Sequence, residues 1–145
     1  MALALSGIFF IFIGIPVLAY DINADYLEVF NREGRAVFTG NVKVADEHGK
    51  ISANRMEVYY ETGGDTIKHI EAYGQVEIVR ENIVGRGQRA QYDVRADTVV
   101  LDGEAFVEDS RGKFYADRIW MDLSAEKLRM HGNIEGVLRR REESG

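Results

Sequence analysis

The side chains that most often perform catalysis are scattered along this sequence. His48, His69 and His131 stand far apart, and the 145 residues include no cysteine. Disulfides and thiolate metal sites are therefore excluded, and no histidine pair has metal-binding spacing. A serine-elbow motif and a glycine-rich phosphate loop are also missing. We therefore predict a non-enzymatic protein without cofactor or metal; the alternative is a polysaccharide-cleaving enzyme that uses paired acids.

Several arginines could bind phosphate, because a guanidinium group matches phosphate geometry. Arg55, Arg89 and Arg118 recur at equivalent positions, where their phase predicts a solvated face or cross-strand ion pairs. The basic run at residues 139–141 could contact phosphorylated sugars or an acidic partner, although terminal charge runs are commonly solvated tails. The net charge of -6 argues against a nucleic-acid partner, since phosphate contacts need a basic field.

The N-terminal segment has the pattern of a secretory signal peptide. Residues 1–19 contain no charged side chain, and an apolar run extends from Ile8 to Leu18. Val17 and Ala19 occupy the positions that signal peptidase reads. A short N-terminal anchor is the alternative, because the apolar stretch is barely long enough to span a bilayer. Both interpretations place the remainder of the chain outside the cytoplasm.

The rest of the sequence contains two interleaved markers that repeat four times. One is a small residue followed by polar and apolar residues, and it begins at Ala24, Ala53, Gly87 and Ala116, at spacings of 29, 34 and 29 residues. The other is a glycine within an alternating apolar run, at Gly40, Gly74, Gly103 and Gly132. Each of the first three glycines precedes the next small-residue marker by 13 residues. Two markers that keep this phase indicate an internal structural repeat.

Within each copy, apolar residues alternate with polar ones, which predicts half-buried strands. Around Gly40, for example, Ala36, Phe38, Val42 and Val44 share one phase, and we expect the glycine to face inward with them. At the small-residue marker the apolar phase shifts by one residue, which is typical of a β-bulge or strand corner. We therefore predict an all-β, antiparallel roll of about four repeated strand pairs, open at both ends. It has about eight long strands, or more if corners split them.

These motifs resemble the OstA/LptA β-jellyroll family, and the resemblance extends from about Asp21 to Val137. The strings that carry it are AVFTGNVKV at residues 36–44, ISANRMEVYY at residues 51–60, IEAYGQV at residues 70–76 and GQRAQYD at residues 87–93. The resemblance implies a twisted β-jellyroll domain at residues 20–138 with a polar tail at residues 139–145. It also implies a periplasmic protein that carries lipopolysaccharide, with its acyl chains in an apolar groove and units stacked end to end. The implied partners are an LptC-like inner-membrane protein, an LptD-like outer-membrane translocon and further copies of the chain.

The inward-phase residues are the candidates for lining such a groove, although the same pattern is expected of an ordinary core. Phe106 lies off the inward phase of its run. A membrane-anchored, LptC-like protein and a stacking assembly protein without lipid remain alternatives. The candidate groove residues are Ile22, Phe38, Val42, Val44, Ile51, Met56, Val58, Val76, Ile78, Tyr92, Leu101, Phe106 and Met121.

Overall fold

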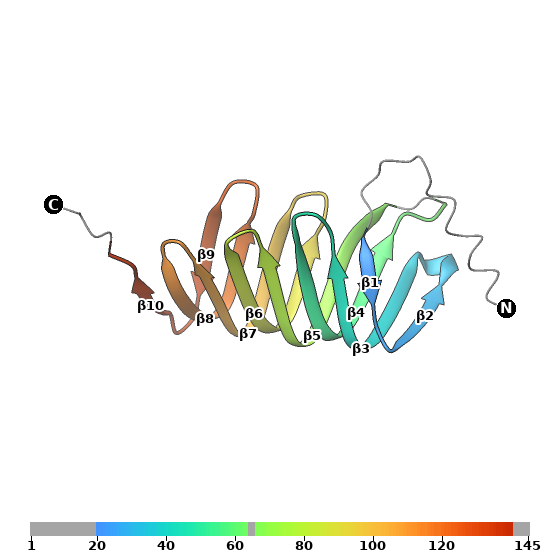
Figure 1. Cartoon of the computed structure of the whole chain (residues 1–145), viewed down its shortest axis with the longest axis horizontal. Helices are drawn as coiled ribbons and strands as arrows, with labels where there is room; N and C mark the ends of the chain where they lie inside the picture. Colours follow the sequence, from blue (N-terminus) through green and yellow to red (C-terminus); the bar gives the residue numbers. More distant parts are fainter. Residues whose placement is uncertain (1–19, 64–65, 141–145) are drawn as a thin grey trace.

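The computed structural model describes residues 20–63 and 66–140, which form a single ten-stranded antiparallel sheet (Figure 1). The predicted signal peptide at residues 1–19 and the last part of the predicted tail, residues 141–145, lie outside the described residues. The strands are β1 (Asp21–Asn23), β2 (Tyr26–Phe30), β3 (Arg35–Ala45), β4 (Gly49–Tyr60), β5 (Ile67–Arg80), β6 (Ile83–Asp93), β7 (Thr98–Asp109), β8 (Gly112–Asp122), β9 (Lys127–His131) and β10 (Glu135–Leu138), and a 3₁₀ turn, η1 (Asn31–Glu33), follows β2.

The strands follow one another across the sheet in chain order. β3 to β8 each pair with the strand before and after them. At the two edges the pairing strand is split, so that β1 and β2 both pair with β3, and β9 and β10 both pair with β8. The all-β antiparallel prediction is therefore confirmed, and corners in the first and last strands raise the expected eight to ten.

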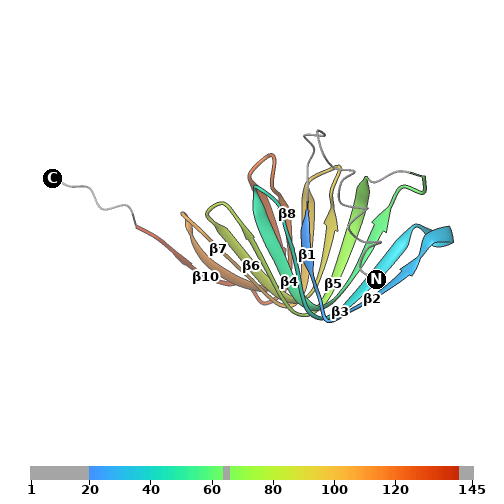
Figure 2. The same cartoon turned by 45° about the vertical axis from the view of Figure 1, so that its right-hand side comes forward.

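Every long strand changes register near its middle. Thr39 pairs with Arg55, and the next pair is Val42 with Ala53, so two residues of β3 oppose one residue of β4. Equivalent shifts interrupt the pairings from β4 to β8. Because a bulge bends its strand, the sheet folds along this line into two arms, and the strands rise from a common base in Figures 1 and 2.

We call the two halves of the folded sheet the first arm and the second arm. The first arm contains β1, β10 and the strand halves that meet at the connections after Ala45, Arg80 and Asp109. The second arm contains β2, β9 and the halves that meet at the connections after Phe30, Tyr60, Asp93 and Asp122. The hairpin connections of each arm therefore lie at its tip, away from the bend.

The repeated glycines make the bend possible. Each adopts a left-handed conformation with φ between 81° and 86°, which non-glycine residues rarely adopt, and the residue after it also has positive φ. A Cβ atom added to Gly103 would lie 2.8 Å from the Cβ of Gln88, and the other three glycines lie similarly against Asp25, Asn54 and Asp117. All four contacted residues are exposed, so the glycines face the outside of the bend. This corrects the expectation that they face inward, and it explains why the two markers keep a fixed phase.

At both edges of the sheet, hydrogen bonds from asparagine side chains stabilise the bend. The Asn41 Nδ2 donates a hydrogen bond of 2.9 Å to Asp25 Oδ2, and Asn133 Nδ2 donates one of 3.0 Å to Asp117 Oδ2. The backbone N–H groups of the same two aspartates donate to the carbonyls of Gly40 and Gly132, each at 2.9 Å. The terminal strands are therefore folded in the same way at opposite ends of the sheet.

The core lies between the two arms. The inner faces of both arms supply it, and its most deeply buried large side chains are Met56, Ile70, Leu101, Ile119 and Met121. The outer face of the second arm carries ion pairs instead, including the predicted cross-strand pair between Arg118 Nε and Asp102 Oδ1 at 2.6 Å. On the same face the Tyr59 hydroxyl donates to Glu57, and this hydrogen bond to a carboxylate raises the pKa of Tyr59 to about 12.

We predict that replacing a bend glycine destabilises the protein far more than replacing a loop glycine of the same conformation. Gly103 and Gly63 have φ values of 81° and 85°, but an added Cβ meets Gln88 only at Gly103 and nothing within 4 Å at Gly63. Gly63→Ala should cost about 1–2 kcal/mol for left-handed backbone alone. Gly103→Ala should cost about 1–3 kcal/mol more because of overpacking. Urea denaturation measures both free energies of unfolding, and equal losses would contradict this role for the bend.

Candidate binding crevice between the arms

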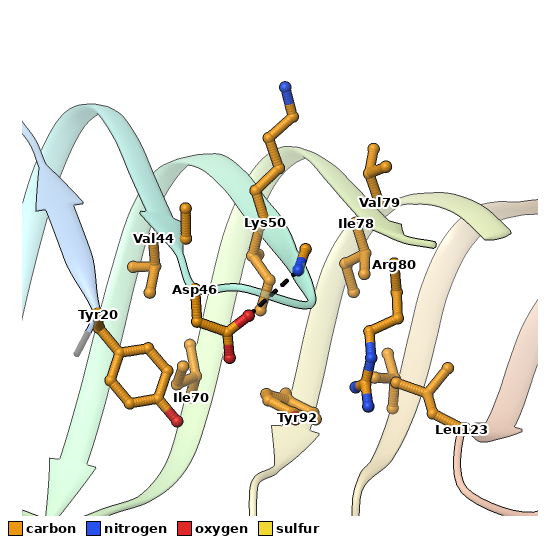
Figure 3. A pocket seen from close by; sticks show the side chains of 14 residues that line it. Tyr20, Val44, Asp46, Lys50, Ile70, Ile78, Val79, Arg80, Tyr92 and Leu123 are labelled. Atoms are coloured by element: carbon orange, nitrogen blue, oxygen red, sulfur yellow. Dashed lines mark hydrogen bonds between the residues drawn. The ribbon is translucent and has the colours of Figure 1, made fainter. Parts of the chain in front are cut away.

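A crevice opens where the two arms separate near their tips. Its cavity volume is only about 40 Å³, so the crevice is narrow. Its lining comes from both arms, as Figure 3 shows. The first arm contributes Val44, Ala45, Asp46, Gly49, Lys50, Ile51, Ile78, Val79 and Arg80, the second arm contributes Ile70, Tyr92, Val99 and Leu123, and Tyr20 lies at the end where the described chain begins.

The walls of the crevice are aliphatic and aromatic, and the polar groups lie at its rim. Asp46 accepts hydrogen bonds from the backbone N–H groups of His48 and Gly49, at 2.8 and 3.1 Å, so its carboxylate caps a turn. The Lys50 side chain points away from the crevice in Figure 3. An apolar wall with a polar rim suits a ligand that has a hydrocarbon part and a polar head.

A second space adjoins the first toward the C-terminal end of the sheet. Its cavity volume is about 170 Å³, and Leu123 lines both spaces. Met121, Leu128 and Ile83 give it apolar walls. Its rim carries Arg111, whose Nη2 pairs with Asp109 Oδ2 at 2.6 Å. The two spaces together extend along the opening between the arms.

One ion pair spans the opening at the level where the two spaces meet. Arg80, the last residue of β5, belongs to the first arm, and Asp97 lies in the turn before β7 in the second arm. The guanidinium binds the carboxylate with two hydrogen bonds, Nη1 to Oδ1 at 2.8 Å and Nη2 to Oδ2 at 3.0 Å. Tyr92 also donates its hydroxyl to Asp97 Oδ1 at 3.0 Å. Across residues 20–63 and 66–140, no other side-chain hydrogen bond or ion pair joins the tips of the arms.

The surroundings of this ion pair lower the pKa of Asp97 and raise the pKa of Tyr92, which donates a hydrogen bond to it. The hydrogen bonds from Arg80 lower the pKa of Asp97, although its burial acts against them. Burial, followed by the nearby negative charge of Asp97, raises the pKa of the Tyr92 hydroxyl. At neutral pH, Asp97 is therefore ionised and Tyr92 is a neutral donor, which is the arrangement that holds the pair together.

Most of the predicted groove residues lie on the inner faces of the arms. Val44, Ile51, Ile78 and Tyr92 line the first space, and Met121 lines the second. The others are buried in the core and line neither of these two spaces: Phe38, Val42, Met56, Val58, Val76 and Leu101.

Two predicted residues lie elsewhere. Ile22 is 36% exposed on the edge strand β1, where it pairs with Val44 and therefore lies at the open end of the crevice. Phe106 is buried on the outer face, between the Arg86 guanidinium, 5.2 Å from its ring centre, and the Tyr115 ring at 4.9 Å. Since its ring faces away from the crevice, Phe106 does not fit the role of a groove residue.

The sequence indicated neither Arg80 nor Asp97 as functional. Ile70 and Val99 carry the inward phase, so their place in the wall agrees with the alternation. Leu123 ends an inward-phase run, and only its position at the junction of the two spaces distinguishes it. No sequence signal links Arg80 to Asp97, because their contact depends on how the two arms face each other.

Comparison with known proteins identifies a family and similar proteins. Residues 21–127, more than half of the chain, match the family described as LptA/(LptD N-terminal domain) LPS transport protein. A protein of Rhizobium meliloti (strain 1021), described as uncharacterized, is 31% identical over 93 residues, which are 59% of this chain and 50% of that protein. The chain thus matches about half the length of this curated relative.

The fold is similar to that in the crystal structure of LptH, the LptA-homologous periplasmic component of the lipopolysaccharide transport device from Pseudomonas aeruginosa. The TM-score is 0.77 at 19% sequence identity, and the match covers 84% of this chain and 96% of LptH. This likeness confirms the predicted β-jellyroll fold.

If the crevice is an opening and not part of the packed core, truncating its wall should cost less stability than truncating the core. Ile119→Ala, at a fully buried position, should cost about 2–5 kcal/mol because the closed cavity cannot collapse. Ile51 borders the opening, so we expect Ile51→Ala to lower the free energy of unfolding by at least about 1 kcal/mol less than Ile119→Ala does. Urea denaturation of both variants tests this. A larger loss for Ile51→Ala would show that the wall is packed as tightly as the core.

Proposed function

Because the chain belongs to the LptA/(LptD N-terminal domain) family of LPS transport proteins, we propose that it carries lipopolysaccharide across the periplasm with the acyl chains held in the crevice between its arms. The family consists of transport proteins and not enzymes, which confirms the prediction of a non-enzymatic protein. The observation that carries the proposal is the apolar crevice with its polar rim. Its walls come from the two arms of the sheet, which are held together at the bend and separate at the tips.

The energetics of acyl burial favour this use of the crevice. Each methylene group removed from water contributes about 0.8 kcal/mol, so a chain segment of about ten methylenes contributes roughly 8 kcal/mol. Parting the arms at their tips breaks few interactions, because the core residues Met56, Leu101 and Ile119 lie deeper. The hydrocarbon can therefore replace contacts at the mouth without unfolding the base.

Both edges of the sheet support end-to-end assembly. Ile22, Leu27 and Val29 are exposed at the N-terminal edge, and Val137 and Leu138 at the C-terminal edge. Their strands pair on one side only, which leaves backbone groups free for a further strand. Pairing of the C-terminal edge of one copy with the N-terminal edge of the next would continue both arms and the crevice between them.

Opposite charges at the two edges favour head-to-tail pairing. Residues 20–34 contain four acidic residues and one arginine, whereas residues 127–140 contain four lysine or arginine residues and one glutamate. Glu28 and Arg129 both occupy the outer face of the second arm, on the edge strands that would meet. Such complementary edges attract, while like edges repel, which selects a heterologous interface over a symmetric one.

The same edges would suit LptC-like and LptD-like partners that present related strands. A membrane-anchored, LptC-like role requires that residues 1–19 are retained. Mass spectrometry of the mature protein tests this, because a mass that corresponds to a chain beginning at Tyr20 excludes the anchor. A stacking protein that binds no lipid is the remaining candidate, and crosslinking to lipid separates it from the transport proposal.

We predict that photo-crosslinkers transfer to lipopolysaccharide in cells from the crevice wall and not from the outer face. Val44 and Lys43 are neighbours on β3 whose side chains point inward and outward, and Ile78 and Glu77 form a second matched pair on β5. Crosslinks at Val44 and Ile78 without crosslinks at Lys43 and Glu77 support lipid transport. If all four positions remain unlabelled while the protein is present at normal levels, the lipid-free stacking role is favoured instead.

Assembly should depend on the edge charges. Arg129→Glu should lower the association constant at least several-fold, and Glu28→Lys in the same chain should restore part of it, because the reversed pair attracts again. Raising the salt concentration toward 1 M should weaken assembly of the wild type, since screening then acts within about 3 Å. Sedimentation velocity measures each case. Arg86→Glu, on the outer face of an inner strand, serves as the matched charge control.

A further inference from the structure

The contact between Arg80 and Asp97 obstructs the opening through which the proposed ligand would enter. Arg80 and Tyr92 line the first space, while Leu123, which lines both spaces, donates its backbone N–H to the Asp97 carbonyl at 3.0 Å. An acyl chain lowered between the arms, or moved along them, therefore meets this pair. In Figure 3 the Arg80 side chain extends toward Leu123 and Tyr92 across the crevice.

The Arg80–Asp97 pair can hold the two arms together and can also separate. Its two hydrogen bonds share the fork geometry of the strongest arginine–carboxylate contacts. Its side chains remain 24% and 22% exposed, so water and a ligand can reach both partners. Asp97 keeps the Tyr92 hydroxyl as a donor when Arg80 leaves, because Tyr92 lies in the same arm. Separation of the arms therefore leaves neither group of the second arm without a partner.

A phosphate group is the natural competitor for Arg80. Guanidinium binds phosphate and carboxylate through the same two parallel N–H donors, so one can replace the other without moving the arginine. The hydrogen bonds from Arg80 lower the pKa of Asp97, and the nearby negative charge of Asp122 acts in the opposite direction. Lys50, the other cation beside the first space, points away and does not offer an alternative there.

We propose that the Arg80–Asp97 pair is a clasp across the crevice, opened when a phosphate on the headgroup of an acylated ligand takes the place of Asp97 on Arg80. This inference rests on the proposed function, because it assumes that acyl chains enter the crevice. It adds a headgroup-binding residue, Arg80, and a closed state in which the two arms are tied together. The ligand class is a phosphorylated amphiphile and not free phosphate, since the clasp opens only as hydrocarbon fills the parted arms.

Two substitutions separate the clasp from the headgroup site. Asp97→Asn removes the charge, and asparagine tolerates the positive φ of 60° at this position. It should raise the affinity for fluorescently labelled lipid A several-fold and keep a preference for lipid A over its dephosphorylated form. Arg80→Gln should bind both lipids alike, with the preference reduced at least about fivefold. Arg95→Gln, an exposed arginine of the same turn, should behave like the wild type.

A covalent link tests whether the arms must part. The chain has no cysteine, so Arg80→Cys/Asp97→Cys can be joined selectively by a short bis-maleimide. The linked protein should lose lipid A uptake, whereas the same variant blocked with a monofunctional maleimide should keep it. Circular dichroism spectra and thermal melting of both forms confirm that the fold is intact.

The outcomes distinguish the clasp from the proposed function. If the wild type binds lipid A but the linked protein takes it up equally well, the clasp is wrong and transport stands. If Arg80→Gln keeps the full preference for phosphorylated lipid A, Arg80 is not the headgroup site. If inorganic phosphate alone abolishes the preference at millimolar concentration, Arg80 is a free-phosphate site and the proposal fails. If the wild type binds no lipid A at all, the proposed function and the clasp fall together.

Discussion

The structure depends on a bend that every strand makes without losing its neighbours. At each bulge one strand has one residue more than its partner, and each left-handed bend glycine lies against a polar side chain of the neighbouring segment. Because the bulges align from β3 to β8, the sheet folds as a unit along one line. A single missing bulge would put two pairing strands out of register on one of the arms. The bend thus determines which faces of the sheet meet.

Packing follows from this fold line. Close to the bend the inner faces are near enough to interdigitate, and the side chains of Met56, Leu101 and Ile119 exclude solvent completely. Farther out the arms diverge and side chains no longer fill the gap, so the same alternation of apolar residues produces a core at the base and a crevice at the tips. One charged contact, Arg80 with Asp97, then holds the tips. The core and the candidate site are therefore the inner and outer parts of the same interface between the two arms.

The sequence predicted what depends on local periodicity and did not predict what depends on the two arms facing each other. Alternation revealed the strands and their inner face, and the paired markers located the bend. The orientation of the bend glycines was predicted wrongly, because a two-residue bulge preserves the apolar phase that an uninterrupted strand would give to Gly40. Depth along the arm separates Val44 from Met56, although both have the same phase. The contact of Arg80 with Asp97 joins residues of different arms and has no local signature.

The meander order of the strands also bears on how the chain acquires its structure. Each strand pairs only with strands that are adjacent in sequence, apart from the split strands at the edges. Contacts of this kind close short loops, so the entropy lost in forming each one is small and folding is fast for an all-β protein. The sheet can therefore grow one hairpin at a time from either end. The first strands to pair need no distant segment of the chain to complete them.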